Sequence, residues 1–315
     1  MKRTVTIVGI GDVETHEAGI GRAGRMLAKG FPLDTGVPGV EMEFAWTHYF
    51  VGYGTPRHKH TFDQFRFALE GPRQIEGGVL DPGDCGFYPE GVPYGPQLQT
   101  EESSGLGLQF MGPSGGPYLT HEDLQNARDR LKAEGGTFAG GVYTRVLPDG
   151  RKINKDSHAA CYEAITGRAP EFPKGRFDAP VIMRANATRW IADRRLPGVA
   201  HKHFGSFGEH RSGIGMRRLA PGARIAAHRQ EDAEILYLTE GSIDYDGKRW
   251  LGGTTRDVGT YLFVRHGAEV NDIATATGAT FLVISLPMLA DIEAERAAGL
   301  AADRREATIA AVAAK

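Results

Sequence analysis

The sequence has few of the residues that cross-link small folds, span membranes or bind nucleic acid. Cys85 and Cys161 are the only cysteines among 315 residues, which excludes a disulfide scaffold and a thiolate metal cage and is typical of a reducing cytoplasm. No apolar run approaches the roughly 20 residues of a membrane-spanning helix. The formal net charge is −2 with no block of lysine or arginine, so we expect neither a membrane nor nucleic acid as a partner.

The N-terminal segment, MKRTVTIVGIGDVETHE, lacks the pattern of a secretory signal. Its apolar stretch is short, and acidic residues follow at once. Together with the scarcity of cysteine, this predicts a cytoplasmic protein.

Glycine and proline are plentiful, with 43 and 17 residues spread along the chain, which favours many short strands joined by turns. One helix is clearly indicated at about 120–134, where Thr120 and Asp123 resemble a capping box and a Gly-Gly pair follows. A second helix is expected over 291–315, an Ala-rich segment of mixed charge with a thin apolar face. That helix either packs on a partner subunit or frays.

A G-x-G-x-x-G pattern occurs between Gly19 and Gly24. A dinucleotide site needs a buried strand directly before this pattern and a helix after it. The preceding residues, DVETHEA, are polar and acidic. We therefore interpret the pattern as a glycine-rich surface loop.

The two halves of the chain share one spacing of characteristic residues. The members of each set are separated by the same intervals: Gly52, His58, His60, Gln64 and Gly71 in the first half; Gly222, His228, Gln230, Glu234 and Gly241 in the second. A second pattern follows each set, again with equal spacing: Gly83, Pro89, Gly91 and Tyr94; Gly259, Arg265, Gly267 and Val270.

These paired patterns resemble the two motifs of the cupin superfamily, G-x5-H-x-H-x3-E-x6-G and G-x5-P-x-G-x2-H, over about 40–112 and 212–287. The resemblance implies a bicupin: an all-β-dominated chain with two antiparallel, jelly-roll-like barrels, each able to hold a metal inside. The expected parts are an N-terminal barrel (1–115), a helix-containing linker (116–190), a C-terminal barrel (191–290) and a C-terminal helix (291–315).

Alternating apolar residues support a strand ahead of the first motif. In VEMEFAWTHYFV, residues such as Phe44, Trp46 and Phe50 recur with a period of two. His48 lies on the same alternation, so we expect it to face the barrel interior. It is then either a third imidazole ligand or a packed, hydrogen-bonded histidine.

Residues two apart in a strand share a face, so His58, His60, Gln64 and Arg66 are expected to point into the first barrel. The resemblance implies a divalent metal on His58 and His60, most favourably Fe²⁺, with Mn²⁺, Ni²⁺ or Zn²⁺ as alternatives. The chain departs from the motif at Gln64, a weak neutral ligand, and at Tyr94, a fourth ligand or a general acid or base. The alternative is a polar pocket without metal.

Arg66 is costly to bury without a partner. That partner is a protein carboxylate, such as Glu41 or Glu70, or the carboxylate of a substrate. Gln97 and Gln109 are further candidates for substrate contact.

The second barrel keeps fewer of the motif ligands. His228 and Glu234 remain, whereas Gln230 and Val270 replace the other two. Because a metal usually needs three or more protein ligands, His228, Gln230 and Glu234 are weak candidates, and we expect this barrel to be structural.

The function expected is that of a metal-dependent oxidoreductase of the dioxygenase type, acting on a small, carboxylate-bearing organic substrate. Two alternatives stay open: a metal-free, sensor-like bicupin that binds a small molecule without turnover, and a cupin lyase or isomerase. The resemblance also implies a homodimer.

Overall fold

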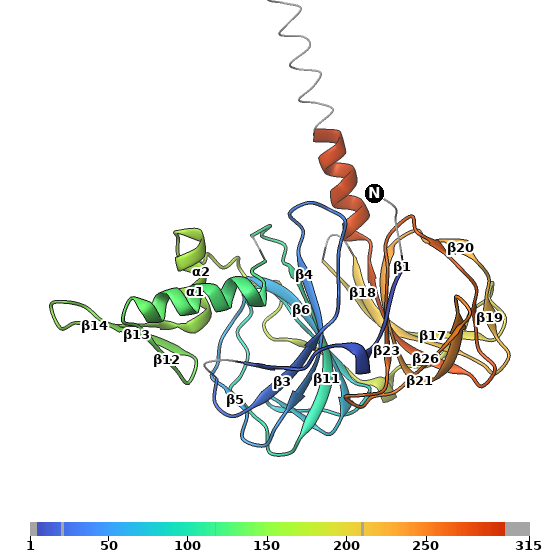
Figure 1. Ribbon diagram of the computed structural model, residues 1–315, viewed down its shortest axis with the longest axis horizontal. Helices are drawn as coiled ribbons and strands as arrows, with labels where there is room; N and C mark the ends of the chain where they lie inside the picture. Colours follow the sequence, from blue (N-terminus) through green and yellow to red (C-terminus); the bar gives the residue numbers. More distant parts are fainter. Residues whose placement is uncertain (1–4, 20–21, 117, 209–210, 300–315) are drawn as a thin grey trace, which may run out of the picture.

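The computed structural model describes residues 5–19, 22–116, 118–208 and 211–299. Two β-rich units lie side by side, a smaller helical unit is attached to the first, and a C-terminal helix projects from the body (Figure 1). The expected fold class, two antiparallel β-units with a helix-containing linker and a C-terminal helix, is confirmed.

The first barrel is built on a seven-stranded antiparallel sheet in the order β15-β9-β6-β11-β4-β3-β2. Shorter pairs, β5–β10 and β7–β8, form the opposite layer. The strand bounds are β2 His16–Ala18, β3 Met26–Gly30, β4 Met42–Tyr49, β5 Gly54–Thr55, β6 Phe62–Glu70, β7 Arg73–Ile75, β8 Gly78–Leu80, β9 Cys85–Tyr88, β10 Gln97–Leu98, β11 Ser103–Met111 and β15 Val181–Met183.

The second barrel repeats this plan. Its main sheet runs β1-β23-β21-β26-β18-β17-β16, and the pairs β19–β25, β20–β24 and β21–β22 complete it. The strand bounds are β1 Val5–Gly9, β16 Ile191–Ala192, β17 Val199–Phe207, β18 Ser212–Leu219, β19 Arg224–Ile225, β20 His228–Arg229, β21 Ala233–Tyr245, β22 Lys248–Leu251, β23 Thr260–Val264, β24 Glu269–Val270, β25 Ile273–Ala274 and β26 Ala279–Leu286.

The two barrels exchange edge strands. β1, at the N-terminal end of the described chain, pairs with β23 of the second barrel. β15, from the segment between the barrels, pairs with β9 of the first. Each strand covers an edge whose backbone groups would otherwise be unpaired, so the strand order does not follow boundaries drawn at single positions in the sequence.

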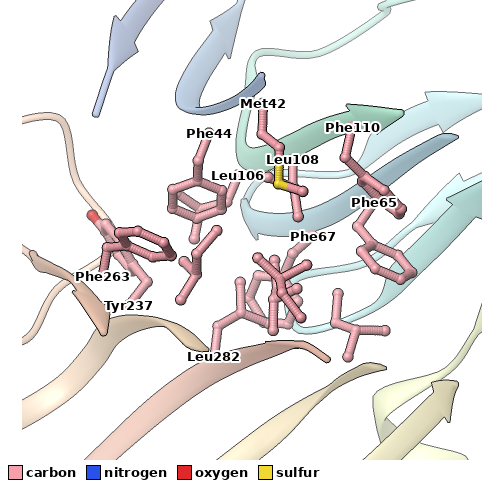
Figure 2. Close-up of a cluster of buried hydrophobic side chains, with 14 of the residues drawn as sticks. Met42, Phe44, Phe65, Phe67, Leu106, Leu108, Phe110, Tyr237, Phe263 and Leu282 are labelled. Atoms are coloured by element: carbon pink, nitrogen blue, oxygen red, sulfur yellow. The ribbon is translucent and has the colours of Figure 1, made fainter. Parts of the chain in front are cut away.

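One face of each main sheet packs against the other barrel. In β6, Phe65 and Phe67 point to this interface, and Tyr237 and Phe263 of the second barrel meet them in one buried cluster (Figure 2). Ring contacts cross the interface, since Phe31 and Phe44 both stack on Tyr261, with centroids 4.7 and 5.5 Å apart. The largest apolar core of the protein is therefore shared by both barrels.

The linker folds into a small unit of its own. It contains α1 His121–Ala133, the hairpin strands β12 Thr137–Ala139, β13 Val142–Val146 and β14 Lys152–Asp156, and α2 Ser157–Thr166. The expected capping box is confirmed, because the Thr120 and Asp123 side chains each accept a hydrogen bond from the other's backbone N–H. Two short 3₁₀ turns, η1 Ile10–Asp12 and η2 Ala185–Ala187, complete the regular structure.

The C-terminal helix begins earlier than expected, at 288, and is described to 299. Its first turn packs Met288, Leu289 and Ile292 into the shared core. The rest of the predicted segment, 300–315, lies outside the described residues. Residues 20–21 of the glycine pattern lie outside the described residues, and Gly24 is followed by β3 rather than by a helix. No helix in the described ranges is long and apolar enough to span a membrane.

Candidate functional site

The interiors of the two barrels differ in chemistry. The second is filled by apolar side chains such as Leu236, Leu238 and Phe281. In the first, the face of β6 that turns away from the shared core carries Gln64 and Arg66, both buried. A buried polar interior inside a stable frame marks the first barrel as the candidate site.

Arg66 is the centre of a hydrogen-bond cluster. Its guanidinium donates to Gln64 Oε1 from Nε at 2.6 Å, to Gln97 Oε1 from Nη1 at 3.3 Å and to Tyr94 Oη from Nη2 at 2.6 Å. The Tyr88 ring lies against its face, 4.2 Å from Cζ to the centroid. Gln64 comes from β6, Gln97 from β10 and Tyr88 from β9, so Arg66 joins both layers of the barrel.

Within the described chain, no carboxylate forms an ion pair with Arg66. The expected protein partners, Glu41 and Glu70, are both exposed, and Glu70 accepts instead from Thr254 Oγ1 at 2.9 Å. Burial acts to lower the pKa of Arg66, but Tyr94 and Tyr88 outweigh it and raise that pKa above its ordinary value. The side chain is thus a permanent, buried positive charge held by neutral groups.

The two motif histidines lie beside this cluster. Backbone hydrogen bonds pair His58 with Tyr94 at 2.9 and 3.0 Å, and the His58 and His60 rings stand edge to face, 4.8 Å apart. His60 Nε2 is 2.7 Å from Tyr94 Oη, and His58 Nδ1 is 2.7 Å from the Pro56 carbonyl oxygen. His60, Tyr94 and Arg66 therefore form one continuous chain of hydrogen bonds.

The direction of that chain follows from donor chemistry. Because a guanidinium can only donate, Tyr94 Oη accepts from Arg66, and its own hydrogen is directed to His60 Nε2. His60 then carries its proton on Nδ1, a buried atom with no hydrogen-bond partner among the described residues. His58 holds its proton on Nδ1 against the Pro56 carbonyl, so the lone pair on Nε2 has no hydrogen-bond donor among the described residues.

Burial keeps these groups neutral at physiological pH. It lowers the pKa of His58 to about 4, with Arg22 adding to the effect, and it lowers the pKa of His60 well below the ordinary value. Burial likewise raises the pKa of Tyr94, although Arg66 opposes the rise. A neutral Tyr94–His60 pair beside a fixed cation can hold or pass one proton.

The interior set does not fit a divalent metal. Gln64 Oε1 and Tyr94 Oη, which stand at two of the four motif positions, are both occupied by hydrogen bonds from Arg66. A metal held there would lie next to a permanent positive charge and would have no carboxylate to balance its own. The described residues contain no group of three or more His, Cys, Asp or Glu placed to hold an ion.

The expectation that His48 faces the barrel interior is wrong. His48 shares its alternation with Trp46, as expected, but that face belongs to the side of the sheet that packs in the shared core. At the end of the strand, His48 stacks on Trp46 and lies 3.2 Å from Glu102 Oε2. It is therefore a packed histidine with a carboxylate partner.

The two glutamines expected at the substrate lie at different depths. Gln97 belongs to the Arg66 cluster, and its Nε2 is buried without a hydrogen-bond partner in the described chain. Gln109 pairs in register with Gln64 across β11 and β6, but its amide oxygen accepts from Tyr118 Oη at 2.9 Å. Gln97 thus has a free donor for a ligand.

In the second barrel, the weak candidates for metal ligands bind other side chains of the protein. Glu234 accepts from Arg217 Nη2 at 3.1 and 3.2 Å, and Val270 is part of the apolar interior. The exposed His228 lies 3.2 Å from Gln230 Oε1 through Nε2. In both barrels, then, an arginine binds the residue at the third ligand position of the motif.

Two residues outside the motifs belong to the site. His158, at the start of α2, places its ring 5.6 Å from that of His60, and its Nε2 is 3.4 Å from Thr61 Oγ1. Arg22 lies close enough to influence the pKa of both His58 and His60. His158 stands in no motif, and Arg22 lies within the Gly19–Gly24 pattern that we interpreted as a surface loop. Only the three-dimensional fold therefore shows their place at the site.

Comparison with known proteins extends these observations. The sequence matches no protein-family model and no curated protein. The structure is similar to that of a candidate dioxygenase from Nostoc punctiforme, with a TM-score of 0.62 and 13% identity over 90% of this chain and 83% of that one. The chain has the bicupin fold.

A second bicupin similarity is weaker. Oxalate decarboxylase from Bacillus subtilis, in a mutant form, matches with a TM-score of 0.51 and 13% identity over 89% of this chain and 76% of that one. That decarboxylase contains Mn(II) centres. At such low identity the similarity describes the fold, and the chemistry has to be argued from the residues of this chain.

Proposed function

We propose that the first barrel of this bicupin binds a small organic carboxylate directly on Arg66, with the guanidinium serving in place of a metal ion. The observation that carries the proposal is a buried cation whose hydrogen-bond partners, Gln64, Gln97 and Tyr94, are all neutral. A buried charge without a counter-charge is unfavourable, and an anionic ligand supplies that counter-charge.

The donor count supports this assignment. A guanidinium has five N–H donors, and the cluster uses three of them. The remaining two, together with the free Nε2 donor of Gln97, suit the two oxygens of a carboxylate. Hydrogen bonds to charged groups contribute about 1.5–3 kcal/mol each, which is enough for specific recognition of a small ligand.

The same arrangement supports acid–base turnover of the bound anion. Tyr94 Oη lies 2.6 Å from Arg66 Nη2 and 2.7 Å from His60 Nε2. A carboxylate on Arg66 therefore lies beside a hydroxyl that can give or take a proton, with His60 behind it as the second proton carrier. This favours a lyase or isomerase over a binder without turnover.

A metal-dependent oxidoreductase of the dioxygenase type, with Fe²⁺, is the second candidate. It is supported by the free Nε2 lone pair of His58, since Nδ1 faces the Pro56 carbonyl, and by the fold shared with a candidate dioxygenase. For this function, Gln64 and Tyr94 must lose their hydrogen bonds with Arg66 and coordinate the ion instead.

The experiment is ligand binding by calorimetry with a panel of small carboxylates, on protein treated with a chelator and on protein reloaded with Fe²⁺. We expect binding without metal, reduced at least about tenfold in Arg66→Met because a charged hydrogen bond is lost. Arg249→Met, at an exposed ion pair with Asp244, is the matched control and should bind normally. Binding that needs Fe²⁺ and disappears in His58→Ala would support the oxidoreductase instead.

A homodimer in the cytoplasm, expected from the sequence, remains part of the proposal. Sedimentation of the purified protein tests the dimer.

A further inference from the structure

Arg22, for which the described residues supply no carboxylate partner, lies where the linker unit meets the first barrel, a place that we call the mouth of the barrel. Ala23 forms a backbone bridge with Gly54, which places Arg22 beside Pro56 at the start of the first motif. A Cβ atom added to Gly141 would lie 2.7 Å from Arg22 Nη1 and 3.0 Å from the Pro56 ring. Arg22 is thus enclosed between the barrel and the β12–β13 turn of the linker unit.

The polar atoms at this junction are buried but unsatisfied. Arg22 Nη1 has no hydrogen-bond partner among the described residues, and the same holds for the hydroxyl of Ser157 and that of Thr55. Ser157 is 4% exposed, and its backbone N–H donates to the carbonyl of Gly141 at 2.9 Å, so it flanks the same glycine as Arg22. Buried donors of this kind are normally paired.

The His58 ring connects this junction to the deep cluster. It hydrogen-bonds Pro56, next to Arg22, and its backbone pairs with Tyr94, which binds Arg66. The positive charges of Arg22 and Arg66 both act on His58. Both guanidiniums therefore lie near the histidine, Arg22 next to Pro56 at the linker unit and Arg66 bonded to Tyr94 in the interior.

We propose that the natural ligand is an organic dianion, with one carboxylate on Arg66 and a second anionic group at the mouth on Arg22 and the Ser157 hydroxyl. This rests on the proposed function, since it assumes the carboxylate on Arg66. A single carboxylate would leave the outer guanidinium uncompensated, whereas a second anionic group would meet both the charge and the free donors.

The charge balance of the barrel agrees with a dianion. Arg73, also buried, donates to the Tyr49 hydroxyl at 2.7 Å and has an Nε without a hydrogen-bond partner among the described residues. Asp156 is the carboxylate that acts on His58 and His158 from the linker side. Its oxygen Oδ1 already caps α2 by accepting from the His158 and Ala159 N–H groups. The site thus holds more positive than negative charge.

The test compares dicarboxylates from malonate to adipate with monocarboxylates of equal carbon number, by calorimetry at fixed ionic strength. We expect one dicarboxylate to bind at least about tenfold more tightly than the monocarboxylate of equal carbon number. This ratio corresponds to the lower end of the free energy that one hydrogen bond to a charged group contributes. Arg22→Gln and Ser157→Ala should reduce that preference while monocarboxylate binding stays; Arg66→Met should weaken both ligand classes.

The outcomes separate the two proposals. Equal binding of both classes at every length, or a preference unchanged in Arg22→Gln, overturns the dianion and leaves the carboxylate on Arg66 in place. Failure of the wild-type protein to bind any acid of the series, or binding indifferent to Arg66→Met, overturns the proposed function and the dianion with it. Arg249→Met and an unchanged near-ultraviolet circular dichroism spectrum control for folding.

Discussion

At the scale of single residues, each barrel contains an arginine that binds the side chain at the third ligand position of the motif. Arg66 binds Gln64 in the first and Arg217 binds Glu234 in the second. In the second barrel the glutamate balances the charge, whereas in the first the amide does not. This single difference, Gln64 against Glu234, leaves Arg66 with an uncompensated charge that an anionic ligand can meet.

If Arg66 stands in place of a metal, restoring the motif should restore metal binding. We expect the triple variant Gln64→Glu, Arg66→Ala, Tyr94→His to hold about one divalent ion per chain, because four N and O ligands meet the usual requirement for a metal site. Wild-type protein, reloaded and dialysed in parallel, should hold far less. Metal content by mass spectrometry is the measurement.

The control for this gain is Gln230→His with Val270→His in the second barrel. There Arg217 still occupies Glu234, so no ion should be retained. Stoichiometric metal in the wild-type protein, bound through His58 and His60, would contradict the prediction and support the oxidoreductase.

The sequence predicted the members of the cluster better than their arrangement. Strand alternation placed Gln64 and Arg66 on one face of a strand, and the resemblance to the cupin motifs added Tyr94 to the same interior. Alternation misplaced His48, since it separates two faces without saying which is inside. Both faces of the first main sheet are buried, and the apolar one, with Trp46, faces the second barrel.

At the scale of elements, α2 covers part of the first barrel through His158. The ring contacts His60 and Phe62, with centroids 5.6 and 5.9 Å apart. Burial lowers the pKa of His158 to about 4; Asp156 opposes this shift and Arg22 reinforces it. The neutral imidazole is therefore the form that allows α2 to pack here.

This predicts that acid weakens the fold through His158. Because the pKa is about 4 when folded against 6.5 when exposed, the unfolded chain takes up the proton first, and stability is lost as pH falls from 6.5 toward 4. One group contributes at most about 3 kcal/mol, at about 1.4 kcal/mol per unit. In urea, His158→Gln should flatten the pH dependence of the midpoint.

His58 and His60 titrate in the same direction, so the variant should reduce the slope without abolishing it. His203→Gln, at an exposed histidine, should leave the slope unchanged. A His158→Gln slope equal to that of the wild-type protein would show that α2 does not depend on this ring.

The elements themselves were predictable where local signals are strong. Helix α1 follows from Thr120, Asp123 and the glycines after it, which act over one turn. Strand β15 is only three residues long, and it is a strand because it pairs with β9, almost a hundred positions earlier in the chain. A contact of that range leaves no periodic pattern in the sequence, and the same is true of the docking of His158.

At the scale of the whole molecule, the shared core predicts that the barrels unfold together. Phe67 is 2% exposed in that core, and Phe→Ala at such a site costs about 3–5 kcal/mol. We expect one calorimetric transition in the wild-type protein and, in Phe67→Ala, one transition at a lower temperature. Leu251→Ala, at an exposed side chain, is the control. Two transitions, with only one shifted, would show that the barrels are independent.

The exchanged edge strands bear on how this protein can be dissected. A cut before residue 181 would leave β9 without β15, and a C-terminal fragment from any cut between the motif repeats would leave β23 without β1. Each half would then present a bare row of amide and carbonyl groups, ready to recruit a neighbouring copy into aggregates. The two repeats are therefore not separable modules, and any attempt to express the first repeat alone must carry residues 181–183 with it.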